Sequence, residues 1–331
     1  MIEIREERTK FYDIYQELYS NLIDEKDMYG KVLYHYTSPE ALISILKQAE
    51  NKKECDTISL HFTRADCLND KAEGNVFFNL YKETLDKLLE ENRISGEFYH
   101  FLCNIEHKNI FWSEEDQFSI YPFKECDTFI CSFSEGSDSL AMWNYYSKND
   151  QYEGYNLGIQ FKEKSELSKS FLNLEVDAEI ALFRVIYDSN KIKECLGEFI
   201  LKLFEKCDLK CEIDRYCIEN DIRLASTILR YIVKNKAFKH EEECRFLINV
   251  AKENCSDIID FRAKKGILIP FINAEFEKKF LKRITIGPLI EKEIAQNTLE
   301  IFLKKNGYKL QYDGSTDDGI QIKSSKVPIR Y

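Results

Sequence analysis

Several common signatures of function are absent from this sequence. The chain has only 12 glycines, and none of them belongs to a GxGxxG or GxxxxGK[ST] motif. Such loops let the backbone approach phosphate groups, so neither a dinucleotide-binding fold nor a P-loop is supported. There is no GxSxG turn, and the run His240–Cys244 lacks the second histidine of an HExxH helix. The hydrolase and zinc-protease signatures are therefore missing as well.

Cysteine patterns for zinc or disulfides, and apolar runs long enough to span a membrane, are also lacking. The 11 cysteines contain no CxxC pair, and Cys207, Cys211 and Cys217 have no histidines at zinc-binding spacing. The cysteine number is odd and the N-terminal residues are too charged for a secretory signal, so we expect reduced thiols. No apolar run approaches the roughly 20 residues that span a bilayer. We expect a soluble, cytoplasmic protein without membrane or metal binding.

The composition is that of a folded, acidic protein. The 331 residues are 44% hydrophobic and 13% aromatic, and the net charge is −11. This content of apolar residues supports an ample core. The negative charge argues against a general nucleic-acid coat and against attraction to anionic membranes, although a local basic groove stays possible.

The clearest local signal is a strand followed at once by a helix. Residues 33–37 have strand character, and Ser38 with Pro39 forms an N-cap and first helical position. Alternation along the strand places His35 and Thr37 on one side and Tyr36 on the other. A polar face before a helix N-terminus can meet an anion or a ribose. Taken alone, the stretch favours a structural histidine.

The order of elements predicts one α+β domain over residues 1–331. An amphipathic helix is expected within residues 1–28, and a helical insertion at 189–236 separates strands of one sheet system. Further strands are expected at 57–63, 128–134, 155–161, 180–187, 243–250, 267–272 and 283–287, with a helix at 291–305 and a terminal hairpin at 308–324. Oligomeric state is left open.

Three further groups of residues can carry chemistry. Asn69 and Asp70 form an Asn-Asp pair that ordinarily caps the following helix. Trp143, Tyr145 and Tyr146 lie on an aromatic helix, which is usually core but can also stack on a nicotinamide or adenine ring. The third group begins an apolar strand, where Glu-x-Glu-x-Arg places Glu241, Glu243 and Arg245 on one side.

A spaced series of motifs resembles the bacterial domain of unknown function 2971 (DUF2971). The series runs from Leu33 to Arg330 and consists of LYHYTS, LND..E, FICSFS with MW.YY, G...GI.F, E.E.R, I.IGP and S..P.R. Two positions depart from the family pattern. Lys71 stands where proline often follows Asn-Asp, and Phe238 stands where tryptophan commonly precedes the glutamates.

The strand-borne histidine and the late glutamate also resemble ADP-ribosyltransferases of the DarT and RNA 2′-phosphotransferase types. This resemblance implies a split mixed or antiparallel sheet core with inserted and peripheral helices. It further implies that NAD is a substrate, that His35 and Thr37 orient its ribose or diphosphate, and that aromatic residues line the nicotinamide pocket. Glu243 would be the catalytic carboxylate, with Glu241 as its substitute. Tyr36, Asn69, Asp70, Trp143, Tyr145, Tyr146 and Arg245 would complete the NAD-binding site.

Three functions stay open at this point. The first is an NAD-using ADP-ribosyltransferase or NAD glycohydrolase, acting on protein, nucleic acid or water, with a toxin or antiphage effector as its natural setting. The second is a non-catalytic module that senses a nucleotide or a protein on the same scaffold. The third, a metal-dependent nuclease using Asp70, Glu73 and Glu243, ranks last because these carboxylates do not share one element at ligand spacing.

Overall fold

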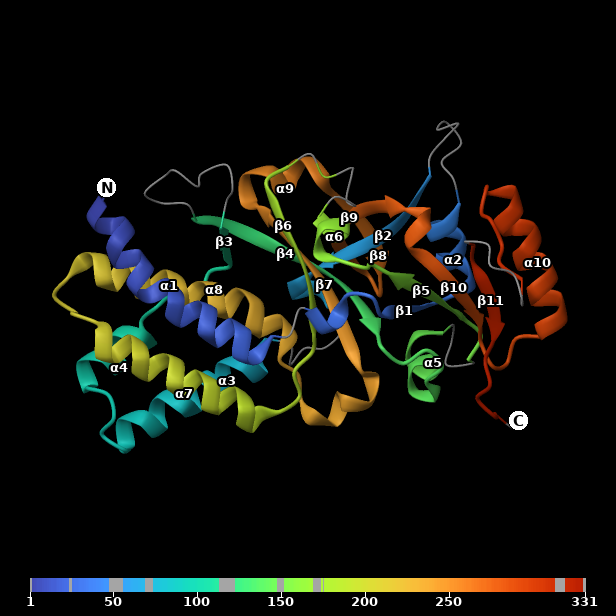
Figure 1. The fold of residues 1–331 in the computed structure, drawn as a ribbon. Coiled ribbons are helices and arrows are strands. Elements are labelled where there is room, and N and C mark those ends of the chain that lie inside the picture. The colour runs from blue at the N-terminus through green and yellow to red at the C-terminus, as the bar shows by residue number, and fades with distance from the viewer. Residues whose placement is uncertain are drawn as a thin grey trace.

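The computed structural model shows an elongated molecule with its two chain ends at opposite sides (Figure 1). Helices α1, α3, α4, α7 and α8 form one half, and a large twisted sheet fills the other. The described residues are 2–23, 26–47, 56–68, 74–112, 123–147, 152–168, 174, 176–312 and 319–329.

The strands of the described residues join in one sheet of mixed direction. They are β1 (Val32–Thr37), β2 (Thr57–Arg64), β3 (Ile110–Trp112), β4 (Phe123–Ser134), β5 (Tyr155–Gln160), β6 (Ala178–Arg184), β7 (Glu243–Ala251), β8 (Ile259–Lys264), β9 (Ile267–Glu277), β10 (Leu281–Ile286) and β11 (Gln321–Ser324). The main path runs β11-β10-β5-β1-β4-β2-β9-β8, while β3 and β7 also pair with β4, and β6 pairs with β7. The pairing between β10 and β11 is parallel, and the pairings between the other named strands are antiparallel.

The helices group around the two faces and the ends of this sheet. They are α1 (Ile2–Leu22), α2 (Pro39–Leu46), α3 (Asn75–Glu90), α4 (Gly96–Cys103), α5 (Leu140–Tyr146), α6 (Lys164–Ser168), α7 (Ser189–Lys206), α8 (Glu212–Ile232), α9 (Lys252–Ile258) and α10 (Lys292–Lys305). The pair α7–α8 connects β6 to its antiparallel neighbour β7, so a helical hairpin stands between two adjacent strands.

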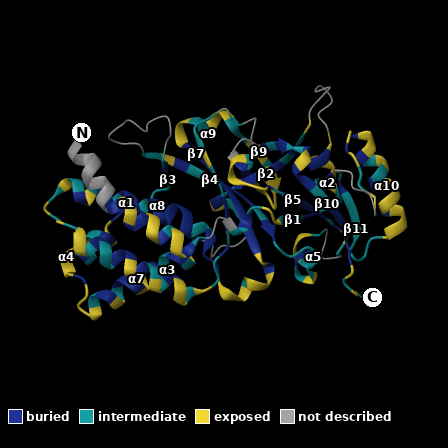
Figure 2. Ribbon diagram, in the orientation of Figure 1, coloured by how far each residue is buried: buried dark blue, intermediate teal, exposed yellow. Residues whose placement is uncertain are grey.

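Two hydrophobic cores result from this arrangement, and buried residues concentrate in the central strands (Figure 2). One core lies between the sheet and α2, α9 and α10. The other joins α1, α3, α4, α7 and α8, and it includes Ile130 of β4 and Leu247 of β7. The predicted apolar stripe of the first helix, including Phe11 and Leu18, is buried in this second core. The helix ends at Leu22, earlier than its predicted limit.

Strand β4 determines where the sheet opens. Its one edge pairs with β7 from Cys126 to Ser134. On its other edge, β2 pairs only near Ile130, and β1 pairs only at Ser134. Strands β1 and β2 therefore diverge from β4, and residues 131–133 lie between the two contact points.

The predicted strand-to-helix junction is confirmed. Strand β1 ends at Thr37, and the Ser38 hydroxyl accepts a hydrogen bond from the backbone nitrogen of Ala41 at 3.3 Å. The backbone amide of Leu42 also donates to the Ser38 carbonyl. Leu42 and Leu46 then bury the inner face of α2. This cap fixes the direction in which the chain leaves β1.

Other elements differ from the sequence predictions. The predicted terminal hairpin is wrong, because β11 pairs in parallel with β10 and the isolated bridge between Leu310 and Ile320 is also parallel. Asn69 and Asp70 lie outside the described residues, and α3 begins later, with Gly74 as its N-cap. Helix α9 and strand β8 were not predicted, because the charged run from Lys252 to Lys265 shows little apolar periodicity.

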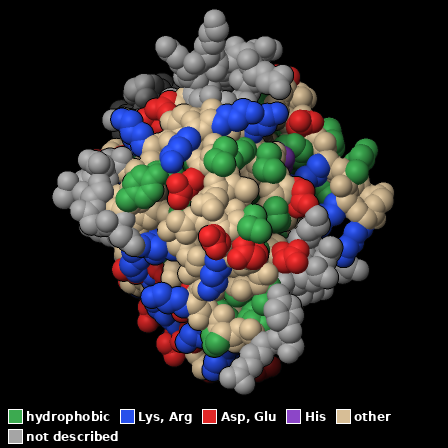
Figure 3. All heavy atoms as spheres, turned by 90° about the vertical axis from the view of Figure 1, so that its right-hand side faces the viewer, with side chains coloured by type: hydrophobic (Ala, Val, Ile, Leu, Met, Phe, Trp, Pro, Cys, Tyr) green, Lys and Arg blue, Asp and Glu red, His purple; other side chains and the backbone are tan. Residues whose placement is uncertain are grey.

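The end of the molecule that carries α10 has a mixed surface. Hydrophobic side chains occur there in small groups between acidic and basic ones (Figure 3). Ile294 and Ile301 of α10 are exposed among them. None of the helices in the described part of the chain combines the length and apolar character of a membrane-spanning segment.

The cap of α2 can be tested by substitution. Replacing Ser38 with alanine removes the hydroxyl that accepts from Ala41, and we expect the free energy of unfolding to fall by about 1 kcal/mol. Chemical denaturation measures the change. Ser44→Ala on the same helix is the control, because Ser44 is exposed and alanine favours a helix interior. Equal destabilisation by both substitutions would contradict a capping role for Ser38.

Candidate functional site

A cavity of about 150 Å³ lies where β1 and β2 diverge from β4. Its walls come from β1, β2, β4, α5, β8 and the segment that leads into β7. The lining residues are Tyr34, His35, Tyr36, His61, Thr63, Leu68, Ile130, Cys131, Ser132, Phe133, Met142, Tyr146, Glu241, Glu243 and Arg262. His35 and Glu243, which are far apart in sequence, thus face one cavity.

His35 spans the gap between β1 and β4. Its Nδ1 lies 3.0 Å from the carbonyl oxygen of Ser132, and its ring contacts Phe133 at 5.3 Å between centroids. A carbonyl oxygen only accepts, so Nδ1 carries the proton and Nε2 is left as an acceptor. Burial lowers the pKa of His35, against a smaller opposing effect of the Ser132 bond. The ring is therefore neutral at pH 7.

Glu243 opens β7 and is held by two cations. Its carboxylate accepts from Arg245 through Nε at 2.8 Å and Nη2 at 3.0 Å, and from Lys234 Nζ at 3.0 Å. The residue is only 3% exposed. Burial alone would raise the pKa of Glu243, but Arg245 and Lys234 outweigh it and hold the pKa at about 2. The carboxylate is permanently ionised at neutral pH.

Lys234 joins this pair to a second buried carboxylate. Its Nζ donates to Glu241 Oε2 at 2.6 Å, and it lies 4.8 Å from the Phe238 ring centroid. Burial lowers the pKa of Lys234, but the attraction of Glu243 and Glu241 is stronger and the net effect is a raised pKa. Between the two glutamates, Glu242 has a left-handed backbone with φ of 45° and ends the 3-10 helix η3 (Lys236–Glu241).

The chain around Lys234 explains how a lysine becomes buried here. Helix α8 ends at Ile232, and Val233 forms a parallel bridge with Ile186. The backbone amide of Lys234 then donates to the Ile186 carbonyl at 3.1 Å. This bridge directs the lysine side chain toward the start of β7, where the carboxylates offset the cost of its burial.

A separate set of bonds fixes the aromatic helix α5 over β1. The Tyr36 hydroxyl donates to Gly136 O at 2.7 Å and accepts from Ser139 N at 3.0 Å. Asp138 accepts from the Trp143 indole at 2.8 Å, from Ser325 Oγ at 2.6 Å and from Lys326 N at 2.7 Å. The segment after β11 is thereby fastened to the turn that precedes α5.

This packing gives the predicted aromatic residues different degrees of burial and different access to the cavity. Trp143 is fully buried, and its ring lies 4.7 Å from the Tyr36 ring between centroids, so it has no exposed face for a ligand and its stacking role stays a prediction without support from this packing. Tyr145 is half exposed, contacts His240 and lies outside the cavity lining. Tyr146 does line the cavity. Tyr36 lines it too, with its hydroxyl committed to the α5 turn.

The remaining predicted residues lie beside the cavity or outside the described residues. Thr37 and Arg245 are buried and absent from the lining, and Arg245 donates to Glu243 and to the Tyr231 carbonyl. Asn69 and Asp70 lie outside the described residues. The structure thus brings together His35, Tyr36, Tyr146, Glu241 and Glu243, and their functional roles stay predictions.

Sequence reasoning missed the cation on the opposite wall. Arg262 of β8 donates through Nη2 to Thr63 Oγ1 at 2.6 Å, and its Nη1 lies 3.4 Å from His61 Nδ1. Burial lowers the pKa of Arg262, and no carboxylate pairs with it among the described residues. No local pattern pointed to it, because the charged strand β8 has almost no apolar alternation and was not recognised as a strand.

The cavity residues favour neither a cysteine nucleophile nor a bound metal ion. Burial raises the pKa of the Cys131 thiol to about 12, so this cysteine is a protonated thiol and a weak nucleophile at neutral pH. Within the described residues, no cluster of three or more His, Cys, Asp or Glu side chains is placed to hold a metal ion. Asp70 and Glu73 of the metal hypothesis lie outside those residues.

Removal of the shared lysine should destabilise the protein strongly. Lys234→Met leaves Glu241 without the cation that binds it and Glu243 with Arg245 only. We expect a loss of roughly 3–5 kcal/mol in the free energy of unfolding, because a buried charge loses its partner. Denaturant titration measures this loss. Lys236→Met, an exposed lysine two positions later, should change stability by less than about 0.5 kcal/mol.

The low pKa of Glu243 predicts a specific acid sensitivity. Its folded pKa of about 2 lies below its ordinary value of 4.5, so its contribution is complete above pH 4.5 and is lost toward pH 2. We expect up to roughly 3 kcal/mol of the acid loss to come from this carboxylate. Unfolding free energies measured between pH 5 and pH 2 should fall less steeply for Glu243→Gln. Identical slopes for both proteins would show that Glu243 titrates normally.

The comparisons with known proteins bear on the strands and helices around the carboxylate cluster. No curated protein and no solved structure matches the chain. A family model with the description "Protein of unknown function (DUF2971)" matches residues 142–246. The matched segment begins in α5 and ends in β7, so it contains Lys234, Glu241 and Glu243 but not His35. The similarity to this family is therefore shown for residues 142–246, and over that segment it agrees with the resemblance seen in the sequence.

Proposed function

We propose that the protein binds NAD or a closely related nucleotide in the cavity between β1, β2 and β4 and cleaves its nicotinamide–ribose bond. The observation that carries the proposal is that a neutral histidine and an ionised glutamate from distant parts of the chain line the same cavity. The ADP-ribose would pass to a protein, a nucleic acid or water. A toxin or antiphage effector is the corresponding biological role.

The charges of the cavity suit this reaction. When the bond between ribose C1′ and nicotinamide breaks, both electrons move to the ring nitrogen, and nicotinamide leaves as a neutral molecule. Positive charge develops on the ribose, and an ionised carboxylate nearby stabilises it. The acceptor then bonds to C1′ and releases its proton to the solvent. With a pKa of about 2, Glu243 acts through its charge and does not take that proton.

The histidine and the arginine would position the substrate from two sides. The unprotonated Nε2 of His35 can accept a hydrogen bond from a ribose hydroxyl, since Nδ1 is committed to Ser132. Arg262, which has no carboxylate partner among the described residues, can bind the diphosphate. The two groups lie on opposite sides of the opening in the sheet, as expected for a ligand with an anionic and a ribosyl end.

The scaffold is consistent with this proposal. A sheet that opens because two strands leave one edge of a third is the kind of split sheet that ADP-ribosyltransferases use for NAD. Under the proposal, the opening between β1 and β2 at residues 131–133 of β4 would be the place for the ligand. The similarity concerns the arrangement of the strands, and it supports only the choice of NAD as the ligand.

The proposal predicts nicotinamide release from NAD. We expect the purified protein to release nicotinamide, and His35→Ala and Glu243→Gln to lower the rate by about 10²–10³. His100→Ala, a change of an exposed histidine on α4, should leave the rate unchanged. Thermal unfolding of each variant separates loss of folding from loss of activity. If Glu243→Gln does not fold, His35→Ala carries the test.

Two outcomes would contradict the proposal in different ways. Absence of both nicotinamide release and NAD binding would exclude an NAD-using function. Release that is the same in both site variants and the unchanged protein would place the reaction elsewhere in the molecule.

One observation favours a second candidate, a nucleotide sensor without turnover. Glu243 is saturated by Arg245 and Lys234, and these two cations offset the negative charge that the reaction would need. In that case NAD or ADP binds and the His35→Ala substitution weakens binding, but no nicotinamide appears.

A further inference from the structure

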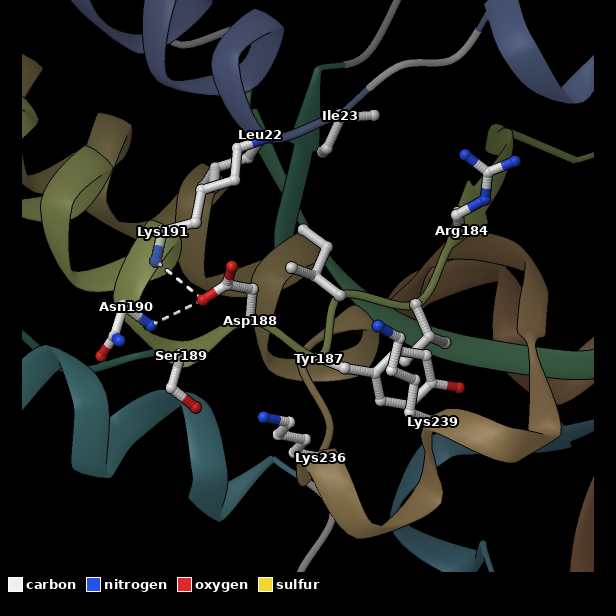
Figure 4. A pocket seen from close by; sticks show the side chains of 12 residues that line it. Leu22, Ile23, Arg184, Tyr187, Asp188, Ser189, Asn190, Lys191, Lys236 and Lys239 are labelled. Carbon is white, nitrogen blue, oxygen red and sulfur yellow. Dashed lines mark hydrogen bonds between the residues drawn. The ribbon is translucent and has the colours of Figure 1, made fainter.

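A larger cavity lies on the other side of the carboxylate cluster. It has a volume of about 690 Å³ and is enclosed by the end of α1, the end of β6, the first turn of α7 and the helix η3 (Figure 4). Its polar lining includes Lys191, Lys236 and Lys239, and its apolar lining includes Leu22, Val185 and Ile186. This size falls in the range of about 300–1,000 Å³ that is common for small-molecule sites.

The charge of this cavity is unlike that of the whole chain. The chain carries a net charge of −11, yet lysines predominate here. Lys191, Lys236 and Lys239 have no ion-pair partner among the described residues. Arg184 is neutralised by Asp27 at 2.6 Å and Glu135 at 2.5 Å. Positive charge is thus left over for an incoming anion.

The one acidic residue of the lining is already engaged. Asp188 is the N-cap of α7, and its Oδ1 accepts from the backbone nitrogens of Asn190 at 3.1 Å and Lys191 at 3.2 Å (Figure 4). Its charge offsets one lysine. The other two remain, and in Figure 4 Lys236 and Lys239 both lie on the side of the cavity opposite Leu22.

The cavity also offers contacts to an uncharged body. Leu22, Ile23, Val185, Ile186 and the ring of Tyr187 supply apolar surface, while Ser189 and Asn190 supply hydrogen-bonding groups. A phosphate ion alone would leave this surface unused. We propose that the cavity is a second binding site, for a nucleotide-sized phosphorylated molecule whose phosphates meet Lys236 and Lys239 and whose ring system packs on the apolar wall.

This site goes beyond the proposed NAD function and is separate from it. Tyr187 connects the two places, because it lines the larger cavity and its hydroxyl accepts from the backbone nitrogen of Glu243, a residue of the smaller cavity, at 3.1 Å. A ligand against Tyr187 would therefore lie one side chain away from the strand that carries Glu243.

ATP is the probe for a calorimetric titration of the full chain. We expect ATP to bind, and Lys236→Ala/Lys239→Ala to weaken ATP binding at least about tenfold, because the double substitution removes two charged contacts to the phosphates. Lys210→Ala should bind as the unchanged protein does. Lys210 is equally exposed, but it follows the far end of α7.

Two further ligands test which chemical class the site accepts, and one further variant tests which cavity binds ATP. Inorganic triphosphate and adenosine should each bind more weakly than ATP, and His35→Ala should bind ATP normally. Absence of ATP binding, or equal affinity for inorganic triphosphate, would overturn the proposal. ATP binding that is lost in His35→Ala and kept in the double lysine variant would also overturn it, by placing ATP in the smaller cavity.

Discussion

The structure depends on keeping one buried carboxylate ionised. Glu243 stands at the start of a strand that is buried along its whole length, where a lone charge would be too costly to maintain. Arg245 from the same strand and Lys234 from the end of α8 make it tolerable. The helical hairpin α7–α8 thus does more than cover the sheet. The segment directly after α8 carries Lys234, and its bond to Glu243 allows β7 to begin with a charged residue.

The same cluster lies between two cavities of different character. On one side, the diverging strands β1 and β2 expose a neutral histidine and an arginine without a carboxylate partner among the described residues. On the other, the junction of β6 and α7 exposes lysines against an apolar wall. Glu243 lines the first cavity and bonds to Tyr187, which lines the second. The fold therefore places its least replaceable ionic contacts where two ligand-sized spaces approach each other.

Sequence patterns were sufficient for the elements whose periodicity is strong. The strand with His35, the cap at Ser38 and the apolar strand after Glu243 could all be read from local residue order. The burial of Lys234 could not be predicted in this way. It depends on the bridge between Val233 and Ile186, which joins residues far apart in sequence and leaves no local pattern. Arg262 was missed since a short, charged edge strand has almost no apolar alternation.

The aromatic helix shows why residue type alone misleads about a site. Trp143 and Tyr36 are the residue types that stack on nucleotide rings, but a tryptophan with its indole bonded to Asp138 serves the core. Of the three predicted aromatic residues of α5, Tyr146 lines the cavity and Trp143 and Tyr145 do not, while Tyr36 lines it from β1. Helical spacing predicted that the rings of α5 lie close together, but tertiary packing determines which of them line the cavity.

The attachment of the C-terminal segment has a consequence for how the molecule is made. Asp138 binds Ser325 and Lys326, and β11 completes the sheet beside β10. Because a ribosome releases the chain from its N-terminus, β1 and α5 emerge long before the residues that lock them together. The cavity with His35 can therefore reach its final form only after residues 321–326 have left the ribosome. While the preceding 320 residues emerge, the nascent chain carries this site without the contacts that fasten α5 to it.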